Sequence, residues 1–314
     1  MFDAEVQSCE DMNQSPDDWL SKVAGIRQWE RGGKRAPHKP LLLLYAFGRL
    51  QAAGRNDPLA YVDVEAPLQN LLDDFGPPRK STPAFPFRRL ANDGLWVITT
   101  NDGQDVKDEP APLRRAEATG QLDPEFAAAL LRDPSLLMKC ARYLLESNFP
   151  ESLQRQIASV VGLDLETGDL AEIIPIEEKR RRSTKFREEV LLAYEYRCAM
   201  CGYEGRLGRD VVGLEAAHVK WWALEGPDDL SNGLALCNMH HLLFDRGVLG
   251  VSEERTVAVS RHFTGNTIST ANIVTGLLGR DLGQPQAGLP VPDELHLAWH
   301  RDQVFRGPSR LVAQ

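Results

Sequence analysis

The feature that most constrains the fold of this chain is a pair of short metal-binding motifs in its C-terminal part. Cys198-x-x-Cys201 is followed by Cys237-x-x-His240. Zinc prefers thiolate and imidazole donors, and two closely spaced pairs close a tetrahedral site with little loss of loop entropy. Buried free thiols are the competing interpretation, which suits Cys140 but not the paired cysteines. We therefore predict one structural zinc ion bound by these four residues.

Length and composition limit the class of protein. The chain has 314 residues, enough for two ordinary domains. Its N-terminus lacks the apolar run of a signal peptide, and the longest apolar stretch, Leu41–Phe47, is far shorter than a membrane span. An odd number of cysteines, with three at metal-ligand spacing, indicates a reducing compartment. We expect a cytoplasmic protein.

Charge gives a mixed indication about nucleic acid as a partner. The net charge of −9 argues mildly against it, but a global sum says little when charges are segregated. Basic residues gather at Arg27–Lys39, Arg88-Arg89, Arg114-Arg115 and Lys179–Arg187. These clusters could contact phosphates, and an ordinary solvated surface is the alternative for each one.

Apolar spacing predicts a mostly helical N-terminal part with a small β element. Predicted helices cover residues 17–30, 40–53, 64–75, 124–149 and 151–161. The helix from Pro40 is apolar on nearly every side, so it should be buried, with Gly54 just past its end. Short apolar runs on either side of Asn92-Asp93-Gly94 predict a β-hairpin.

The chain is predicted to be an α+β protein of two domains. A mostly helical first domain with a small β element would cover residues 1–160, a basic linker residues 161–183, and a second domain residues 184–314, beginning with a helix through Tyr196. The polar composition between Gly162 and Arg182, without a clear period, is the basis for the linker.

The zinc motif leaves His218, Asn232 and His241 unexplained. Adjacent residues of a helix point about 100° apart, so His240 and His241 should serve different centres. His218 is expected at the end of a strand, Asn232 in a turn-rich loop, and His241 on a helix. That order matches a ββα-metal nuclease site.

Residues 186–262 resemble an HNH endonuclease domain, with CAMCG, EAAHVK, LSNGLALC and HHLLFDRGVL in matching order and spacing. The resemblance implies that His218 is the general base and that Asn232 holds the loop and orients His218. It also implies that His241 helps to bind one Mg²⁺ or Mn²⁺ at the scissile phosphate. Histidine titrates near neutrality, and a cation can stabilise the departing 3′-oxygen, as phosphodiester hydrolysis requires.

One position departs from the HNH pattern. Many relatives place a second metal ligand directly before the base, where this chain has Ala217. Glu215 could substitute for it only with a local bulge in the strand. We therefore expect His241, water and DNA phosphates to hold the cation.

The N-terminal part resembles the sulfur-binding domain of McrA-type phosphorothioate-dependent Type IV restriction enzymes, through APHKPLLLLYA and AFPFRRLANDGLW. The short streptomycete members of that family, which lack extra domains, also end in an HNH domain. The resemblance implies that the chain binds double-stranded DNA carrying phosphorothioate linkages.

An apolar cavity would accept sulfur and leave an oxygen desolvated without a partner, a loss of about 1–3 kcal/mol. Phe85, Pro86 and Phe87 can form such a wall, with core packing as the alternative. His38 and Lys39 would hold the remaining charged oxygen. Further DNA contacts are expected from Arg88 and, at guanine edges, from Arg114 or Arg115.

The sequence thus predicts a modification-dependent endonuclease that recognises phosphorothioated DNA and cleaves nearby. A nuclease specific for methylated DNA is one alternative, and a zinc-containing DNA-binding regulator without cleavage is the other. Cleavage of both strands is compatible with a homodimer, although no motif specifies one.

Overall fold

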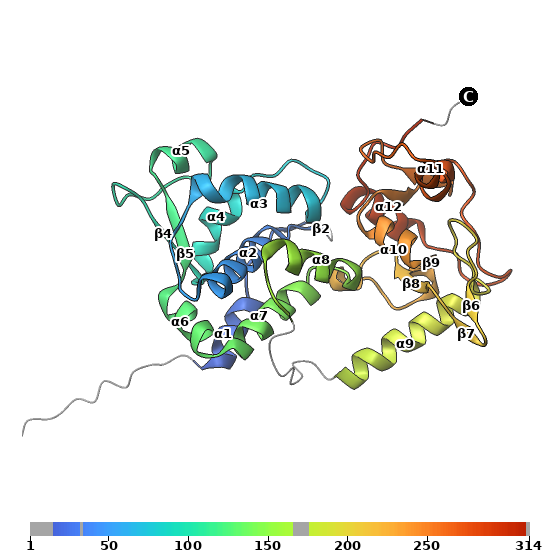
Figure 1. Ribbon diagram of the computed structural model, residues 1–314, viewed down its shortest axis with the longest axis horizontal. Helices are drawn as coiled ribbons and strands as arrows, with labels where there is room; N and C mark the ends of the chain where they lie inside the picture. Colours follow the sequence, from blue (N-terminus) through green and yellow to red (C-terminus); the bar gives the residue numbers. More distant parts are fainter. Residues whose placement is uncertain (1–14, 32–33, 166–175, 312–314) are drawn as a thin grey trace, which may run out of the picture.

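The computed structural model describes residues 15–31, 34–165 and 176–311. We call residues 15–165 the N-terminal half and residues 176–311 the C-terminal half. The two lie side by side, and helix α8 (Glu151–Val161) of the first packs against helix α10 (Asn238–Asp245) of the second (Figure 1). The mixture of helices and small sheets agrees with the predicted class.

The N-terminal half is built around helix α2 (His38–Ala53), whose apolar residues Leu41–Leu44 and Phe47 have no exposed surface. Gly54 ends it in the left-handed conformation, at φ 65°, as predicted. The helices around it are α1 (Pro16–Ala24), α3 (Tyr61–Phe75), α4 (Ala84–Arg89), α5 (Pro110–Arg115), α6 (Pro124–Arg132), α7 (Pro134–Glu146) and α8. Asp133 and Pro134 divide the helix that we predicted over residues 124–149.

The predicted hairpin around Asn92-Asp93-Gly94 is wrong. The segment before it forms α4 and a 3-10 turn (Leu90–Asp93), because Phe87 and Leu90 are spaced to bury one helical face. The strand after it, β4 (Trp96–Thr99), pairs instead with β5 (Thr119–Leu122). β5 also pairs with β3 (Leu59–Ala60), giving the order β3-β5-β4. β1 (Glu30–Arg31) and β2 (Lys34–Arg35), strands of two residues each, pair antiparallel before α2.

The C-terminal half centres on an antiparallel pair, β8 (Leu214–His218) and β9 (Gly233–Cys237), in unbroken register from Leu214↔Cys237 to His218↔Gly233. Helix α10 follows β9 directly, and α9 (Ile176–Ala193) packs across both strands. A Cβ on Gly233 would lie 2.4 Å from Val190 of α9, so this glycine permits the close approach. The other elements are β6 (Arg206–Leu207), β7 (Asp210–Val211), β10 (Leu249–Val251), β11 (Val257–Val259), α11 (Ile268–Ile273) and α12 (Glu294–Gln303).

The basic run that we assigned to a linker belongs to a helix. α8 ends at Val161, with Gly162 in the left-handed conformation, but α9 already begins at Ile176. Residues 176–183 are therefore helical, which shortens the predicted linker at its C-terminal end. Residues 166–175 lie outside the described residues.

The two halves share buried contacts. Trp221 and Val304 of the C-terminal half belong to the apolar core of the N-terminal half. Arg79 donates to Oε1 of Gln303 at 2.6 Å, and Arg306 donates to the carbonyl of Gly76 at 3.0 Å. The contact therefore fixes the two halves relative to each other through both packing and hydrogen bonds.

No helix in the described ranges is long and apolar enough to cross a membrane.

Candidate active site and metal centre

The four predicted zinc ligands come together. Their donor atoms all lie within 4.8 Å of one another, and Nδ1 of His240 is 3.5 Å from Sγ of Cys198 and 3.2 Å from Sγ of Cys237. Cys198 and Cys201 lie in the turn after α9, Cys237 ends β9, and His240 is in the first turn of α10. Nε2–H of His240 donates to the carbonyl of Ile273 at 2.8 Å, which leaves Nδ1 facing the thiols.

The protonation of this cluster suits a cation. Hydrogen bonds from Cys201 and Cys237 lower the pKa of the Cys198 thiol, which favours its thiolate form. Burial acts to lower the pKa of His240, but its contacts with Cys198 and Cys237 outweigh burial and raise that pKa to about 10. Three sulfur atoms and one imidazole thus converge on one point. Three cysteines and one histidine form a donor set of the zinc type.

His218, Asn232 and His241 lie on the predicted kinds of element. His218 is the last residue of β8, Asn232 ends a 3-10 turn (Leu230–Asn232) just before β9, and His241 lies on α10. The side chains of His240 and His241 leave the helix in different directions, the first toward the cysteines and the second toward Glu215 and Asp245.

Asn232 closes the loop between β8 and β9. Its side chain is fully buried, and Oδ1 accepts from the backbone N–H of Lys220 at 2.8 Å. Nδ2 donates to the carbonyls of Lys220 and Pro227, each at 2.9 Å. Its own carbonyl accepts from the N–H of Val219 at 2.9 Å. Asn232 therefore fixes the backbone directly after His218.

His218 is held as a neutral imidazole. Its Nε2 lies 2.7 Å from Oδ1 of Asp228, and its ring stacks on Phe186 at a centroid distance of 4.1 Å. Burial lowers the pKa of His218, although Asp228 acts in the opposite direction. A neutral ring that donates through Nε2–H to a carboxylate keeps Nδ1 free to accept a proton. The side chain is 23% exposed, so solvent reaches it.

His241 lies between two carboxylates. Nδ1 is 2.6 Å from Oε2 of Glu215, and Nε2 is 3.2 Å from Oδ2 of Asp245. Burial acts to lower the pKa of His241, but Asp245 and Glu215 outweigh it and raise that pKa to about 10. The side chain of Asp245 is 1% exposed and that of Glu215 is 46% exposed, so the Glu215 side of the ring is open to solvent.

Glu215 corrects one of our expectations. It reaches His241 from a strand in regular register, so no bulge is needed. The reason is that Glu215 and Ala217 lie on the same face of β8, since side chains alternate along a strand. The pKa of Glu215 is lowered, first by its hydrogen bond with His241 and further by the charges of His241 and Arg187.

Asp245 is a site residue that we did not predict. It follows His241 by four positions, and residues at this spacing share one face of a helix. That spacing is a signal the sequence contains. Glu215 and Asp245 contact opposite nitrogens of His241, so the donor atoms of these three residues do not converge on one point. Among the described residues, the cysteine–histidine cluster is the only group of side chains whose donor atoms lie close enough together to hold a metal ion.

The predicted oxygen-binding pair of the N-terminal half is less charged than we expected. Nδ1 of His38 lies 3.3 Å from Oγ of Ser81. Burial, with a smaller effect from Arg79, lowers the pKa of His38 to about 4. His38 is therefore neutral at pH 7 and supplies no charge, which corrects our expectation. Nζ of Lys39 lies 2.5 Å from Oδ2 of Asp93 and is already paired.

The predicted apolar wall is divided between core and surface. Phe87 is fully buried, with edge-to-face contacts to Tyr61 at 5.1 Å and Trp96 at 5.6 Å. Its assignment to a DNA-binding wall is wrong, because packing under these two rings leaves no accessible surface. Pro86 is also buried. Phe85 is 36% exposed, with the guanidinium of Arg89 4.8 Å above its ring.

The predicted DNA-contacting arginines differ in availability. Arg88 pairs with Asp105 at 2.6 Å, and Arg114 makes two hydrogen bonds to Glu65 at 2.8 and 2.6 Å. Either one would have to leave its carboxylate to contact DNA. Arg115 is exposed and has no ion pair with any residue that the structure describes.

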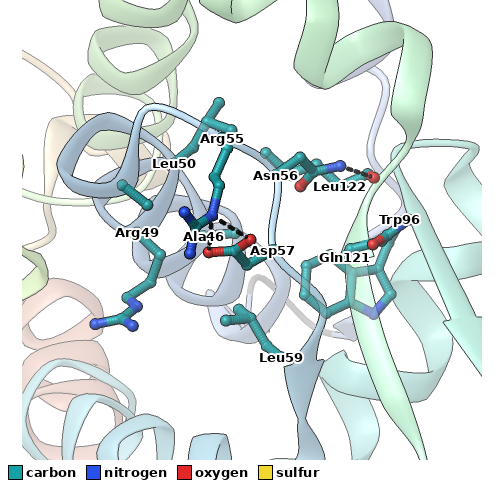
Figure 2. A pocket seen from close by; sticks show the side chains of 11 residues that line it. Ala46, Arg49, Leu50, Arg55, Asn56, Asp57, Leu59, Trp96, Gln121 and Leu122 are labelled. Carbon is teal, nitrogen blue, oxygen red and sulfur yellow. Dashed lines mark hydrogen bonds and ion pairs between the residues drawn. The ribbon is translucent and has the colours of Figure 1, made fainter.

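A cavity of about 30 Å³ lies elsewhere in the N-terminal half (Figure 2). Arg49, Arg55, Asp57, Trp96 and Gln121 are among its lining residues, and Nε of Arg55 bonds to Asp57 at 2.7 Å. This volume holds about one or two water molecules. None of the predicted DNA-binding residues lines this cavity.

Two family models match the chain. Residues 16–166 match the ScoMcrA-like DNA sulfur-binding domain, and residues 198–252 match an HNH endonuclease. Both predicted resemblances are confirmed, and with them the prediction of a DNA endonuclease. Comparison with curated proteins gives no match.

Several solved structures are similar to the chain. The sulfur-binding domain of SprMcrA complexed with phosphorothioated DNA is 22% identical, over 49% of this chain and 98% of that chain, with a TM-score of 0.43. The corresponding domain of ScoMcrA, also complexed with phosphorothioated DNA, is 20% identical over 46% and 94%, with a TM-score of 0.40. The Type IV phosphorothioation-dependent restriction endonuclease ScoMcrA is 12% identical over 71% and 93%, with a TM-score of 0.38.

Proposed function

Because this chain joins a ScoMcrA-like DNA sulfur-binding domain to an HNH endonuclease domain, we propose that it is a modification-dependent restriction endonuclease that recognises phosphorothioated DNA and cuts nearby. The observation that carries the proposal is the pairing of a neutral His218 with the carboxylate-bound His241. His218 ends β8 and His241 lies on α10, and these two elements contact each other. A proton acceptor beside a cation-binding group is the combination that phosphodiester hydrolysis requires.

Cys198, Cys201, Cys237 and His240 would hold a structural zinc ion. Four protein ligands complete a tetrahedral shell and leave no position for substrate, which distinguishes a structural site from a catalytic one. The hydrogen bond from His240 to the carbonyl of Ile273 orients the ring for this role. The ion would join the turn after α9 to the first turn of α10.

Nδ1 of His241 and the carboxylate of Glu215 would hold the catalytic Mg²⁺ or Mn²⁺. These two donors lie on the open side of the ring, whereas Asp245 is buried on the other side and orients His241 through Nε2. When bound, the cation supplies positive charge to the scissile phosphate and the departing oxygen. Binding at Nδ1 would release the proton that His241 now shares with Glu215.

His218 would act as the general base. Nδ1 accepts a proton from a water molecule, whose oxygen then attacks phosphorus, and the 3′-oxygen departs with the electron pair of the broken P–O bond. Asp228 fixes the tautomer by accepting from Nε2–H, and Asn232 fixes the backbone that follows the base. Two such sites would cut both strands, and a homodimer remains a prediction.

Sulfur recognition would depend on Phe85 and on a neutral His38. Sulfur is larger than oxygen and a poorer hydrogen-bond acceptor, so an exposed ring discriminates by leaving an oxygen without a partner. The beginning of α2 and the segment before α4 are adjacent, since His38 contacts Ser81. Arg89, which lies above Phe85 and would have to leave Asp108, and the exposed Arg115 would contact neighbouring phosphates.

The test uses matched plasmids that carry phosphorothioate linkages, methylated cytosine or neither. Zinc-loaded protein with Mn²⁺ should cut the first plasmid only. His218→Ala should bind that plasmid normally and cut it about 10²- to 10⁴-fold more slowly. Cutting of the methylated plasmid alone would refute sulfur recognition. Binding by the wild-type protein without any cutting would instead identify a zinc-containing regulator.

A further inference from the structure

The buried carboxylate of Asp245 is contacted from three different parts of the chain, by an ion pair with His241 and by two hydrogen bonds. Nε2 of His241 lies 3.2 Å from Oδ2, and Nε1–H of Trp221 donates to Oδ1 at 3.0 Å. The third donor is the hydroxyl of Ser152, which donates to Oδ2. Ser152 belongs to α8, so the N-terminal half supplies one hydrogen-bond donor to a carboxylate in the proposed active site.

Each of these donors matters because Asp245 is only 3% exposed. A buried carboxylate without water needs protein donors to offset the cost of its desolvation. Oδ2 is shared between His241 and Ser152, so the hydroxyl helps to fix the oxygen that holds the imidazole. Loss of the hydroxyl would leave Oδ2 with His241 alone and free to rotate toward other donors.

Trp221 connects the same carboxylate to the contact between the halves. It lies three residues after His218, in the loop that Asn232 closes, and its side chain belongs to the apolar core of the N-terminal half. Its ring also makes an edge-to-face contact with Trp299 at 5.8 Å. Two of the three donors to Asp245 therefore depend on docking of the N-terminal half against the C-terminal half.

We propose that Ser152 is a positioning residue which the sulfur-binding domain contributes to the nuclease site. Through Asp245 it holds His241 in the orientation that binds the catalytic cation. The proposal rests on the cation site inferred above. On this proposal, the docking of the two halves in Figure 1 helps to hold the nuclease site, because separation of α8 from α10 would remove the Ser152 hydroxyl from Asp245.

The test measures cation binding directly. Ser152→Ala, as full-length zinc-loaded protein, should need about tenfold more Mn²⁺ for half-saturation, the size of effect typical when an outer-shell partner of a metal ligand is removed. Electron paramagnetic resonance of free Mn²⁺ gives this value without DNA. The Mn²⁺ dependence of cleavage should shift by the same factor, while affinity for a phosphorothioated duplex without divalent cation stays unchanged.

Two further variants distinguish the effect of losing the Ser152 hydroxyl from the effect of changed side-chain packing. Ser152→Thr keeps the hydroxyl and should restore the wild-type Mn²⁺ dependence. Ser159→Ala changes an exposed serine on the same helix and should behave as the wild type. Wild-type Mn²⁺ binding by Ser152→Ala would overturn the inference, as would equal defects in Ser152→Ala and Ser152→Thr.

The readouts also distinguish this inference from the proposed function. If Ser152→Ala weakens Mn²⁺ binding but the wild-type protein never cuts DNA, the nuclease proposal fails and the role of Ser152 stands. If the wild-type protein cuts and Ser152→Ala is unaffected, only the role of Ser152 fails. A wild-type protein that binds no Mn²⁺ overturns both.

Discussion

His240 and His241 are consecutive residues whose rings face separate sites. Nδ1 of His240 lies 3.2 Å from Sγ of Cys237, whereas Nδ1 of His241 lies 2.6 Å from Oε2 of Glu215. Consecutive residues of an α-helix differ by about 100° in direction, so α10 presents one imidazole to thiols and the next to carboxylates. The short helix therefore links the proposed structural ion to the proposed cleavage site.

Removal of one zinc ligand should unfold the C-terminal half. Cys201→Ser leaves three ligands, and in small metal sites the free energy of metal binding is a large part of the free energy of folding. We expect loss of bound zinc and loss of the thermal transition of this half, with that of the N-terminal half retained. Elemental analysis measures the zinc content, and calorimetry measures the thermal transitions. Cys140→Ala is the control, because Cys140 is buried in α7, and it should keep its zinc. A Cys201→Ser protein with full zinc content would contradict a four-ligand site.

The pH dependence of cleavage should reflect His218. Burial lowers its pKa below 6.5, Asp228 and Asp245 act to raise it, and His241 acts to lower it. A general base must be unprotonated, so the decline of the rate at acid pH should have its midpoint below pH 6.5. Asp228→Asn removes a group that raises the pKa, so the decline should move to still lower pH. Single-turnover rates at saturating Mn²⁺ measure both, and a wild-type decline centred above pH 6.5 would exclude His218 as the base.

Stability should fall at acid pH because of His38. Its pKa is about 4 in the folded protein against an ordinary value of 6.5, so folding favours the neutral ring. This contribution to stability is fully present above pH 6.5 and is lost as pH falls toward 4, a difference of about 3 kcal/mol. His38→Asn should lessen the decline in the free energy of unfolding between these pH values. Urea unfolding at several pH values measures it, and parallel curves for the two proteins would refute the burial argument.

Local patterns predicted the sites better than the contacts around them. The convergence of the four cysteine and histidine side chains follows from their spacing, because short loops bring such pairs together. His218, Asn232 and His241 follow from the order strand, loop, helix. Asp245 could also have been predicted from the sequence, because it follows His241 by four residues on one helix. Ser152 was not, because its contact with Asp245 exists only when the two halves dock, and no periodicity encodes docking.

Two errors in the N-terminal half, the predicted hairpin and the assignment of Phe87 to a DNA-binding wall, have a common cause. Asn92-Asp93-Gly94 marks a chain reversal, but such residues end helices as well as join strands. The apolar spacing of Phe87 and Leu90 decides between the two, and it is helical. Once that segment is a helix, its aromatic residues face opposite ways. Phe87 then enters the core and Phe85 remains at the surface.

Phe85 and Phe87 should therefore respond differently to truncation. Phe87→Ala removes a fully buried ring between Tyr61 and Trp96, and should cost about 3–5 kcal/mol in the free energy of unfolding. Phe85→Ala removes a partly exposed ring, and should cost about 1 kcal/mol or less. Its effect should appear in recognition, as an approximately tenfold smaller preference for phosphorothioated over ordinary duplex, which corresponds to about 1.4 kcal/mol. Urea unfolding and competition binding measure the two quantities. Unchanged sulfur preference in a folded Phe85→Ala protein would show that another surface selects the mark.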